Sequence, residues 1–264
     1  MTTLWDPGLY GRFEAERERP IRDLIGELDG VGYQKIVDLG CGAGLSTEAL
    51  AKRFPGAFLT GVDTSPDMLA AARARLPKVG FLQAGVEVWS DPSADLVFAN
   101  AVMHWVRGHL FVMQRLASEL PPGGRLAVQM PDNEAEPSHA LMREIAARAR
   151  FRHRLADVGT TRDPIGSPEA YDDALSPYCD TVAIWRTMYV HRLSGPDDIV
   201  AVVQGAGLRP FLAPLDESEK QEFLAAYREE IAKAYPIRAW GGVFFRFPRL
   251  FVVGGRRENA SAHG

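Results

Sequence analysis

Residues 35–130 alternate between short apolar runs and segments whose apolar residues recur at helical spacing. This alternation constrains the fold more than any other feature, because strands joined by helical crossovers pair in parallel with right-handed connections. The sequence therefore predicts an α/β, doubly wound, mostly parallel sheet, with two later runs adding strands six and seven. Strands are predicted at 35–39, 57–62, 80–84, 95–99, 125–130, 179–193 and 245–257, and helices at 45–54, 66–76, 106–120, 139–152, 197–207 and 216–235.

The chain beyond residue 130 interrupts the alternation with two helical stretches, 134–178 and 194–240. Ligands of doubly wound sheets lie beyond the carboxyl ends of the strands, so we expect these stretches to form a helical lid there. The predicted organisation is a single domain over 1–256 with a tail at 257–264 that we expect to be disordered. Its core comprises about 20–133, 179–193 and 243–256, with a first helix beginning at Pro20.

Three glycines, Gly40, Gly42 and Gly44, follow the first strand as G-x-G-x-G. This spacing overlaps with the G-x-G-x-x-G of dinucleotide enzymes but does not match it. Asp63 ends the second strand nineteen residues after Gly44, where a carboxylate accepts hydrogen bonds from the ribose hydroxyls of an adenosine ligand. The glycine loop and Asp63 together predict an adenosine-binding site, but they do not indicate which cofactor binds there.

Asp38 indicates which cofactor binds. It lies two residues before Gly40, at the end of the first strand. A carboxylate at this place repels a dinucleotide pyrophosphate. S-adenosylmethionine carries a positively charged ammonium and a positively charged sulfonium. A carboxylate at the loop entrance attracts both groups. We therefore predict S-adenosylmethionine as the cofactor and S-adenosylhomocysteine as its product.

The motifs VDLGCGAG, DLVFAN and PPGG before RLAVQM, with Asp63, resemble the class I S-adenosylmethionine-dependent methyltransferases. Further segments are similar to the members of that family that methylate trans-aconitate, in nearly the same order over almost the entire chain. These segments are DPGLYGRFEAERERP, VFANAVMHW, LAVQMPDNEAEPSHALMRE, IWRTMYVH, GAGLRPFL and FPRLFVV. The resemblance implies a seven-stranded Rossmann-like fold and a carboxyl O-methyltransferase that forms the monomethyl ester of trans-aconitate, a small tricarboxylate.

The cofactor site is expected to combine the glycine loop, the strand ends and one arginine that the resemblance assigns to the methionine carboxylate. One position departs from the family pattern: Gly85 stands where an acidic residue usually accepts from the adenine amino group. The backbone of Gly85 and Val86, or the Glu87 side chain, is expected to replace it. The predicted cofactor-binding residues are Arg19, Asp38, Gly40, Cys41, Gly42, Gly44, Asp63, Thr64, Met68, Gly85, Val86 and Asn100.

Methylation of a carboxylate needs no general base, because carboxylic acids with a pKa of roughly 3 to 5 are already ionised at neutral pH. No catalytic residue is therefore required, and Tyr10 and His104 are candidates for positioning. The two carboxylates that are not methylated keep their charge and suit Arg, His and Tyr donors. The predicted substrate-binding residues are Tyr10, Arg17, His104, Trp105, Asn133, Arg186, Tyr189, His191, Arg209, Arg246 and Arg249, with Tyr189 and His191 on the opposite strand face from Arg186.

Composition excludes several other classes of protein. A net charge of −4 argues against a general nucleic-acid binder, and Cys41 and Cys179 do not suggest a disulfide framework or a metal site. No apolar run reaches the roughly 20 residues of a membrane span, and the N-terminus lacks the blocks of a signal peptide, so we expect a cytoplasmic protein without a membrane partner. The oligomeric state is not indicated. Three alternatives stay open: a methyltransferase for another small carboxylate or small molecule, an NAD-dependent oxidoreductase, and a non-catalytic cofactor-binding protein.

Overall fold

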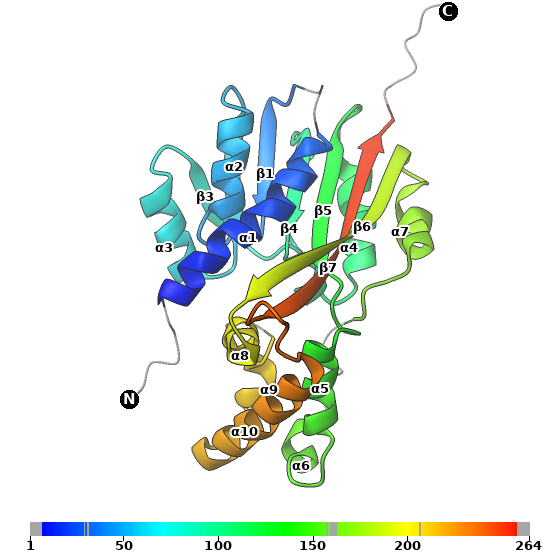
Figure 1. Cartoon of the computed structure of the whole chain (residues 1–264). Helices are drawn as coiled ribbons and strands as arrows, with labels where there is room; N and C mark the ends of the chain where they lie inside the picture. Colours follow the sequence, from blue (N-terminus) through cyan, green and yellow to red (C-terminus); the bar gives the residue numbers. More distant parts are fainter. Residues whose placement is uncertain are drawn as a thin grey trace, which may run out of the picture. The chain divides into compact units, whose positions relative to one another are not determined.

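The computed structural model describes residues 7–28, 30, 32–156, 158, 163–205 and 207–257, with side chains from residue 17 onward (Figure 1). The chain divides into two compact units. The first, termed the sheet unit, comprises Arg17–Pro131, Asp163–Thr187 and Arg249–Gly264. The second, termed the helical unit, comprises Met1–Glu16, Asp132–Arg162 and Met188–Pro248. The predicted tail lies almost wholly outside the described residues, and whether the chain acts as a single domain stays a prediction.

A seven-stranded sheet with the order β3-β2-β1-β4-β5-β7-β6 confirms the predicted fold class. The pairs β1–β2, β2–β3, β1–β4 and β4–β5 are parallel, and β5–β7 is antiparallel. Each predicted strand is present, with bounds shifted by at most two residues. The strands are β1 Lys35–Leu39, β2 Phe58–Asp63, β3 Gly80–Gln83, β4 Leu96–Asn100, β5 Arg125–Pro131, β6 Cys179–Leu193 and β7 Val243–Arg256.

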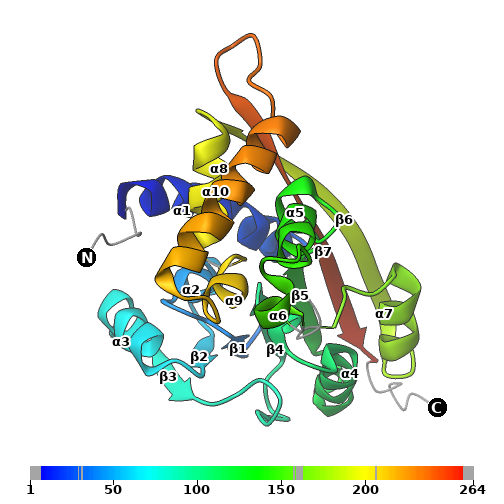
Figure 2. The ribbon, with the colours of Figure 1, turned by 90° about the horizontal axis from the view of Figure 1, so that it is seen from below.

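The sheet unit buries one face of its strands against α4 (His109–Glu119) and α7 (Pro168–Leu175), which lie side by side (Figure 2). Alternate strand residues such as Val37, Val97 and Val128 join this core. Because successive side chains point to opposite faces, Asp38, Phe98 and Gln129 belong to the other face. The helix α2 (Leu45–Arg53) lies on that second face, where its first residues contact Asp38.

The helix α3 (Pro66–Arg75) begins as the sequence predicts. The Ser65 hydroxyl accepts a hydrogen bond from the Met68 backbone N–H, and Pro66 occupies the first helical position. The predicted helix 106–120 is shorter in the structure. A 3₁₀ turn, η1 (Met103–Trp105), precedes it, and α4 starts only at His109.

The first helix was predicted to begin at Pro20, and this prediction is wrong. The helix α1 spans Pro7–Gly26, with Pro20 inside it. A proline is tolerated best at the first position of a helix, and Pro7 rather than Pro20 occupies that position. Burial of Ile21, Leu24 and Ile25 on one stripe holds the segment helical beyond the internal proline.

The helical unit packs α5 (Pro137–Ala146) and α8 (Pro196–Gln204) against α10 (Glu217–Ala234), as Figures 1 and 2 show. Its core includes Phe223, Tyr227 and Ile231 from α10. Tyr227 donates from its hydroxyl to the backbone oxygen of Ser138, 2.6 Å away, which fixes α5 on α10. Two short helices, α6 (Arg152–Leu155) and α9 (Arg209–Leu212), complete the unit.

Residues 163–178, which we assigned to the lid, lie in the sheet unit instead. Tyr171 and Leu175 of α7 are fully buried in the same core as β1, β4 and β5. The Pro/Gly-rich sequence before α7 predicted an excursion, but the two apolar residues four apart on α7 supply a buried stripe that docks on the sheet.

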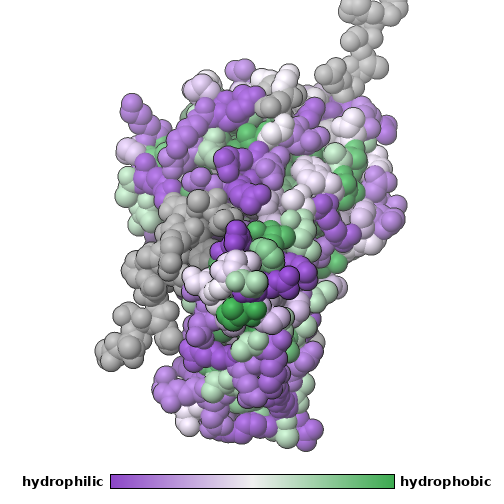
Figure 3. Space-filling model, in the orientation of Figure 1, coloured by the Kyte–Doolittle hydropathy of each residue, from purple (hydrophilic) through white to green (hydrophobic). Residues whose placement is uncertain are grey.

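On the face that Figure 3 shows, hydrophobic residues lie among polar ones. Examples are Phe58, Val88 and Phe111, each more than half exposed. Within the described residues, no helix combines the length and the apolar character that crossing a membrane requires.

A buried polar pair joins α4 to α7. The Tyr171 hydroxyl lies 2.9 Å from His109 Nε2 and accepts a hydrogen bond from the Gly166 N–H at 3.2 Å. Which of the Tyr171 hydroxyl and His109 Nε2 donates in this pair depends on the tautomer of the His109 ring. Burial lowers the pKa of His109, so the ring is neutral and can accept.

We predict that Tyr171→Phe lowers the free energy of unfolding by about 1–3 kcal/mol, because the His109 ring and the Gly166 N–H both lose a hydrogen-bond partner inside the core. Tyr178→Phe is the matched control, since the Tyr178 hydroxyl makes no hydrogen bond to the described residues and its ring packs against the same core. Urea unfolding of both variants measures the difference. Equal unfolding free energies for the two variants contradict a stabilising pair.

Candidate functional site

The glycine loop joins β1 to α2, and its glycines serve different purposes. Gly40, Gly42 and Gly44 all have positive φ angles, of 68°, 55° and 87°. A Cβ at Gly40 would lie 2.3 Å from the Val102 side chain, so Gly40 allows the segment after β4 to cross the loop. No described heavy atom lies within 4 Å of a Cβ at Gly42, so the bare backbone there faces open space, where a ligand can approach it.

Asp38 is fully buried beneath this loop. Its Oδ2 accepts hydrogen bonds from Ser46 Oγ at 2.7 Å and from Thr47 Oγ1 at 2.6 Å. Its Oδ1 has no hydrogen-bond partner among the described residues. Burial raises the pKa of Asp38 to about 6, the two hydroxyl bonds oppose this shift, and the negative charge of Asp63 adds to it.

The unmatched oxygen of Asp38 is the feature that fits S-adenosylmethionine best. A buried anionic acceptor without a donor is unfavourable until a cation approaches it. The ammonium of the predicted cofactor provides a donor and the opposite charge together. A pyrophosphate provides neither.

Asp63 holds the glycine loop in place. Its Oδ2 accepts from the Gly42 N–H and its Oδ1 from the Ser65 N–H, both at 2.9 Å. Sequence reasoning assigned Asp63 to the ribose hydroxyls and did not foresee these backbone bonds. Each carboxylate oxygen has a second lone pair, so the ribose role is compatible with the observed bonds and stays a prediction.

The Glu87 side chain lies beside Gly85 after the end of β3. A Cβ at Gly85 would lie 2.8 Å from Glu87 Oε2 and 3.9 Å from Thr64. The Glu87 carboxylate therefore lies where a side chain at Gly85 would lie, and its contact with the adenine stays a prediction. Val86 is buried, whereas Thr64 and Met68 are exposed.

Sequence reasoning missed Arg115 on α4, which shapes this loop. Its guanidinium donates to the backbone oxygens of Trp89, Val86 and Glu87 at 2.9, 3.2 and 3.3 Å. Glu119, one turn along the helix, accepts from the same group. An Arg and a Glu four residues apart are common on exposed helices, so the sequence gives no signal of this role.

Asn100 ends β4 beside the glycine loop. Its side chain is half-buried, and its Oδ1 is buried without a hydrogen-bond partner among the described residues. The next residue, Ala101, has a φ of 55°, which turns the chain sharply into η1. This turn carries His104, half-buried, and Trp105, 45% exposed, whose rings lie 5.1 Å apart.

Cys41 is buried and packs within the loop. Its Sγ would lie 2.9 Å from a Cβ at Gly61, its N–H donates to the Val62 oxygen, and its own oxygen accepts from the Gly44 N–H. Burial and the neighbouring carboxylates raise the pKa of the thiol, so it is inert. Cofactor contact by Cys41 stays a prediction.

Four arginines that the sequence predicts to bind substrate or cofactor belong to the sheet unit. Arg17 is half-buried and Arg19 exposed on α1, and Arg186 is exposed on β6. Arg249 is half-buried on β7, next to β5, and donates to Gln129 Oε1 at 3.1 Å.

The remaining substrate candidates belong to the helical unit. Tyr189 and His191 are buried on the same strand face, as alternation predicts, and His191 packs against Phe245 and Phe247. Asn133 is buried before α5, whereas Arg209 and Arg246 are exposed. The side chain of Tyr10 lies outside the described residues. The substrate roles of all these residues stay predictions.

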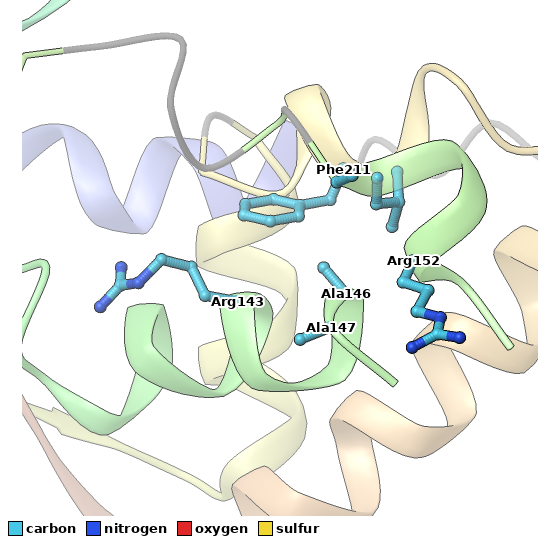
Figure 4. Close-up of a pocket in the computed structure, with 7 residues that line it drawn as sticks. Arg143, Ala146, Ala147, Arg152 and Phe211 are labelled. Carbon is cyan, nitrogen blue, oxygen red and sulfur yellow. The ribbon is translucent and has the colours of Figure 1, made fainter. Parts of the chain in front are cut away.

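A pocket of about 280 Å³ lies among the helices of the helical unit and contains no predicted site residue (Figure 4). Its lining is mainly apolar, and the guanidinium groups of Arg143 and Arg152 point away from each other. It is lined by Arg143, Ala146, Ala147, Arg152, Leu155, Ala156 and Phe211. Among the residues that the structure describes, no group of three or more His, Cys, Asp or Glu side chains is arranged to hold a metal ion.

Comparison with known proteins gives three kinds of match. A family model described as a methyltransferase domain matches residues 37–128. The trans-aconitate 2-methyltransferase of Rhodopseudomonas palustris (strain BisB18) is 52% identical over 250 residues, which are 94% of this chain and 98% of that protein. The enzyme of that name from Methylobacterium nodulans is 51% identical over 253 residues, 96% of this chain and 98% of that protein.

The chain belongs to the trans-aconitate 2-methyltransferase family. This membership confirms the predicted resemblance and makes the chain a methyltransferase, which excludes the oxidoreductase. The identity extends far beyond residues 37–128, over both the sheet unit and the helical unit.

Solved structures support the fold of the family at low sequence identity. The YcgJ protein from Bacillus subtilis has a TM-score of 0.58 and 17% identity, and the match covers 92% of this chain and all of that one. A Haemonchus contortus phosphoethanolamine N-methyltransferase, solved with S-adenosylhomocysteine, has a TM-score of 0.51 and 15% identity over 91% of this chain and 53% of that one.

We predict that Asp38→Asn stabilises the ligand-free protein increasingly as the pH rises from 4 to 7. The native pKa of Asp38, about 6, lies above its ordinary value of 3.8, so the wild type loses stability as the buried carboxyl ionises through this window. The shift corresponds to a gain on the order of 3 kcal/mol for the variant at pH 7. Denaturant unfolding at several pH values measures it.

The same variant should bind S-adenosylhomocysteine at least tenfold more weakly at pH 7.5, because the Asn amide places a donor or a neutral oxygen opposite the ammonium. Asp67→Asn, at an exposed position of α3, is the control for loss of one acidic group. A stability difference that does not change with pH, or unchanged binding, contradicts the role given to Asp38.

Proposed function

We propose that this chain transfers a methyl group from S-adenosylmethionine to one carboxylate of trans-aconitate and forms its monomethyl ester. The observation that carries the cofactor is the buried Asp38 carboxylate with an unmatched oxygen beneath the open backbone of Gly42. The acceptor is supported by relatives named trans-aconitate 2-methyltransferase that share about half of their residues with almost the whole chain.

The cofactor-binding residues that we propose lie along the ends of β1, β2, β3 and β4. Asp38 and Asn100 present buried acceptor oxygens to the ammonium of the methionine part. The glycine loop supplies backbone at the ribose, and Asp63 keeps that backbone in place while accepting from the hydroxyls. Glu87 accepts from the adenine amino group in place of a side chain at Gly85.

When bound, S-adenosylmethionine supplies a methyl group on a positively charged sulfur, which becomes a neutral thioether as the methyl leaves. The attacking oxygen belongs to a carboxylate that is ionised at neutral pH, so the protein moves no proton. Its residues hold both reactants in line and keep water out. Well-oriented pairs of reactants gain up to about 7–11 kcal/mol from such positioning in model reactions.

Residues of the protein must hold the reacting carboxylate weakly and the other two firmly. The reacting carboxylate loses its charge as the new bond forms, so a strong ion pair to it opposes the reaction. The other two keep their charge, and arginine donors can bind them without a penalty. Selectivity for a tricarboxylate therefore depends on donors to these two groups.

We predict that the purified protein converts trans-aconitate and S-adenosylmethionine to a monomethyl ester and S-adenosylhomocysteine, detected by mass spectrometry. Citrate, isocitrate and cis-aconitate in the same assay should react at least tenfold more slowly, because they place the three carboxylates differently. Heat-treated protein is the control. Ester formation with another small carboxylate but not with trans-aconitate would favour the alternative acceptor that the sequence left open.

A further inference from the structure

Arg115 of α4 donates from one guanidinium to three backbone oxygens of the turn that follows β3. Its Nη1 lies 2.9 Å from the Trp89 oxygen, and its Nη2 lies 3.2 Å from the Val86 oxygen and 3.3 Å from the Glu87 oxygen. Glu119 also accepts from Nη1, at 3.0 and 3.1 Å. The turn belongs to neither a strand nor a helix, so this side chain supplies donors that regular structure does not.

The turn is anchored on both sides in the core of the sheet unit. Val86 and Trp89 are buried in that core, together with residues of α4 such as Leu116. The Gly85 oxygen accepts from the Trp89 N–H at 3.0 Å, which closes the turn. Glu87 lies between the two buried residues and is itself exposed. A restrained backbone therefore carries a carboxylate that faces outward.

The Glu87 side chain folds back over Gly85. Its Oε2 lies 2.8 Å from the position of a Cβ at Gly85, and Thr64 Cγ2 lies 3.9 Å from the same position. Thr64 directly follows Asp63, the last residue of β2. The carboxylate is therefore close to the ends of both β2 and β3. The adenine lies at this place if Asp63 binds the ribose.

The position of such a carboxylate depends on the backbone that carries it. A glutamate side chain has several rotatable bonds, so its carboxylate on a mobile turn would occupy many positions. A planar guanidinium with five donors can hold several oxygens at fixed relative positions, whereas the compact ammonium of a lysine cannot bridge them in the same way. Arg115 in this way ties the turn to α4, which packs in the core.

We propose that Arg115 is a positioning residue for recognition of the adenine amino group, because it holds the turn from which Glu87 folds over Gly85. This inference rests on the proposed function, which assigns Glu87 to that amino group, and it deepens the proposal by naming the residue on which the assignment depends. The ligand class concerned is an aminopurine nucleoside. The consequence is selectivity against an oxopurine, which presents an acceptor oxygen where adenine presents a donor.

The test measures the preference for S-adenosylhomocysteine over S-inosylhomocysteine, in which an oxygen replaces the adenine amino group. Calorimetry gives both dissociation constants, and their ratio is the preference. The wild type should prefer S-adenosylhomocysteine at least tenfold, because a carboxylate opposite the purine oxygen is unfavourable. Arg115→Met should reduce this preference at least fivefold and Arg115→Lys at least threefold, since both release the turn. A merely structural defect would weaken both ligands equally and leave the ratio unchanged.

Gly85→Ala tests the same arrangement without removing a contact of Arg115. The added Cβ would lie 2.8 Å from Glu87 Oε2, so the end of this flexible side chain must move. The preference should fall at least fivefold, as in Glu87→Gln, whose amide can turn a donor toward the purine oxygen. Arg257→Met removes an exposed arginine that pairs with Asp180 in the same unit. It is the control and should keep the wild-type preference.

A double-mutant cycle shows whether Arg115 acts through Glu87. In a Glu87→Gln background, Arg115→Met should change the preference less than twofold, because the carboxylate that Arg115 positions is already gone. Additive effects would overturn the inference, and so would an unchanged preference in both Arg115 variants or in Gly85→Ala. A wild type without any preference overturns the Glu87 assignment and the inference together. A wild type that forms no ester overturns only the proposed acceptor, since the preference is measured without one.

Discussion

The rest of the site depends on one buried carboxylate, that of Asp38. Two hydroxyls from the first turn of α2 hold one oxygen, and the other oxygen is left without a donor. A charge placed this way disfavours the ligand-free state, as the raised pKa of the group records. A ligand with an ammonium offsets that penalty, whereas a phosphate increases it. We therefore propose that the buried charge of Asp38 selects a methyl donor over a dinucleotide.

The glycine loop above Asp38 combines structural and binding requirements. Gly40 leaves space for Val102, and this contact brings the segment after β4 against the loop. Gly42 donates its N–H to Asp63, so the second strand restrains the same loop. Three strands thus fix one short turn, and the backbone at Gly42 remains open to a ligand. Rigid positioning of this kind is what methyl transfer between two bound reactants requires.

The sequence predicts the sheet well because buried parallel strands are continuous apolar runs with glycine or proline at their ends. It places Asp38, the glycine loop and Asp63 correctly at the ends of β1 and β2. It fails at the start of α1, where a rule for proline at helix starts applies to Pro7 and not to Pro20. It also misses Arg115, whose hydrogen bonds to the loop after β3 join residues far apart in the chain. The arginines predicted to bind the acceptor stay predictions, because no local pattern distinguishes a binding arginine from an exposed one.

Proton release on ligand binding tests the central claim most directly. Titration of S-adenosylhomocysteine into the protein at pH 6, in buffers of different ionisation enthalpy, measures the protons exchanged per binding event. Because Asp38 with a pKa of about 6 is about half protonated in the free protein, we predict release of about half a proton at pH 6. Almost none should be released at pH 8 or by Asp38→Asn. Binding without proton release at pH 6, or equal release by the variant, would contradict the account.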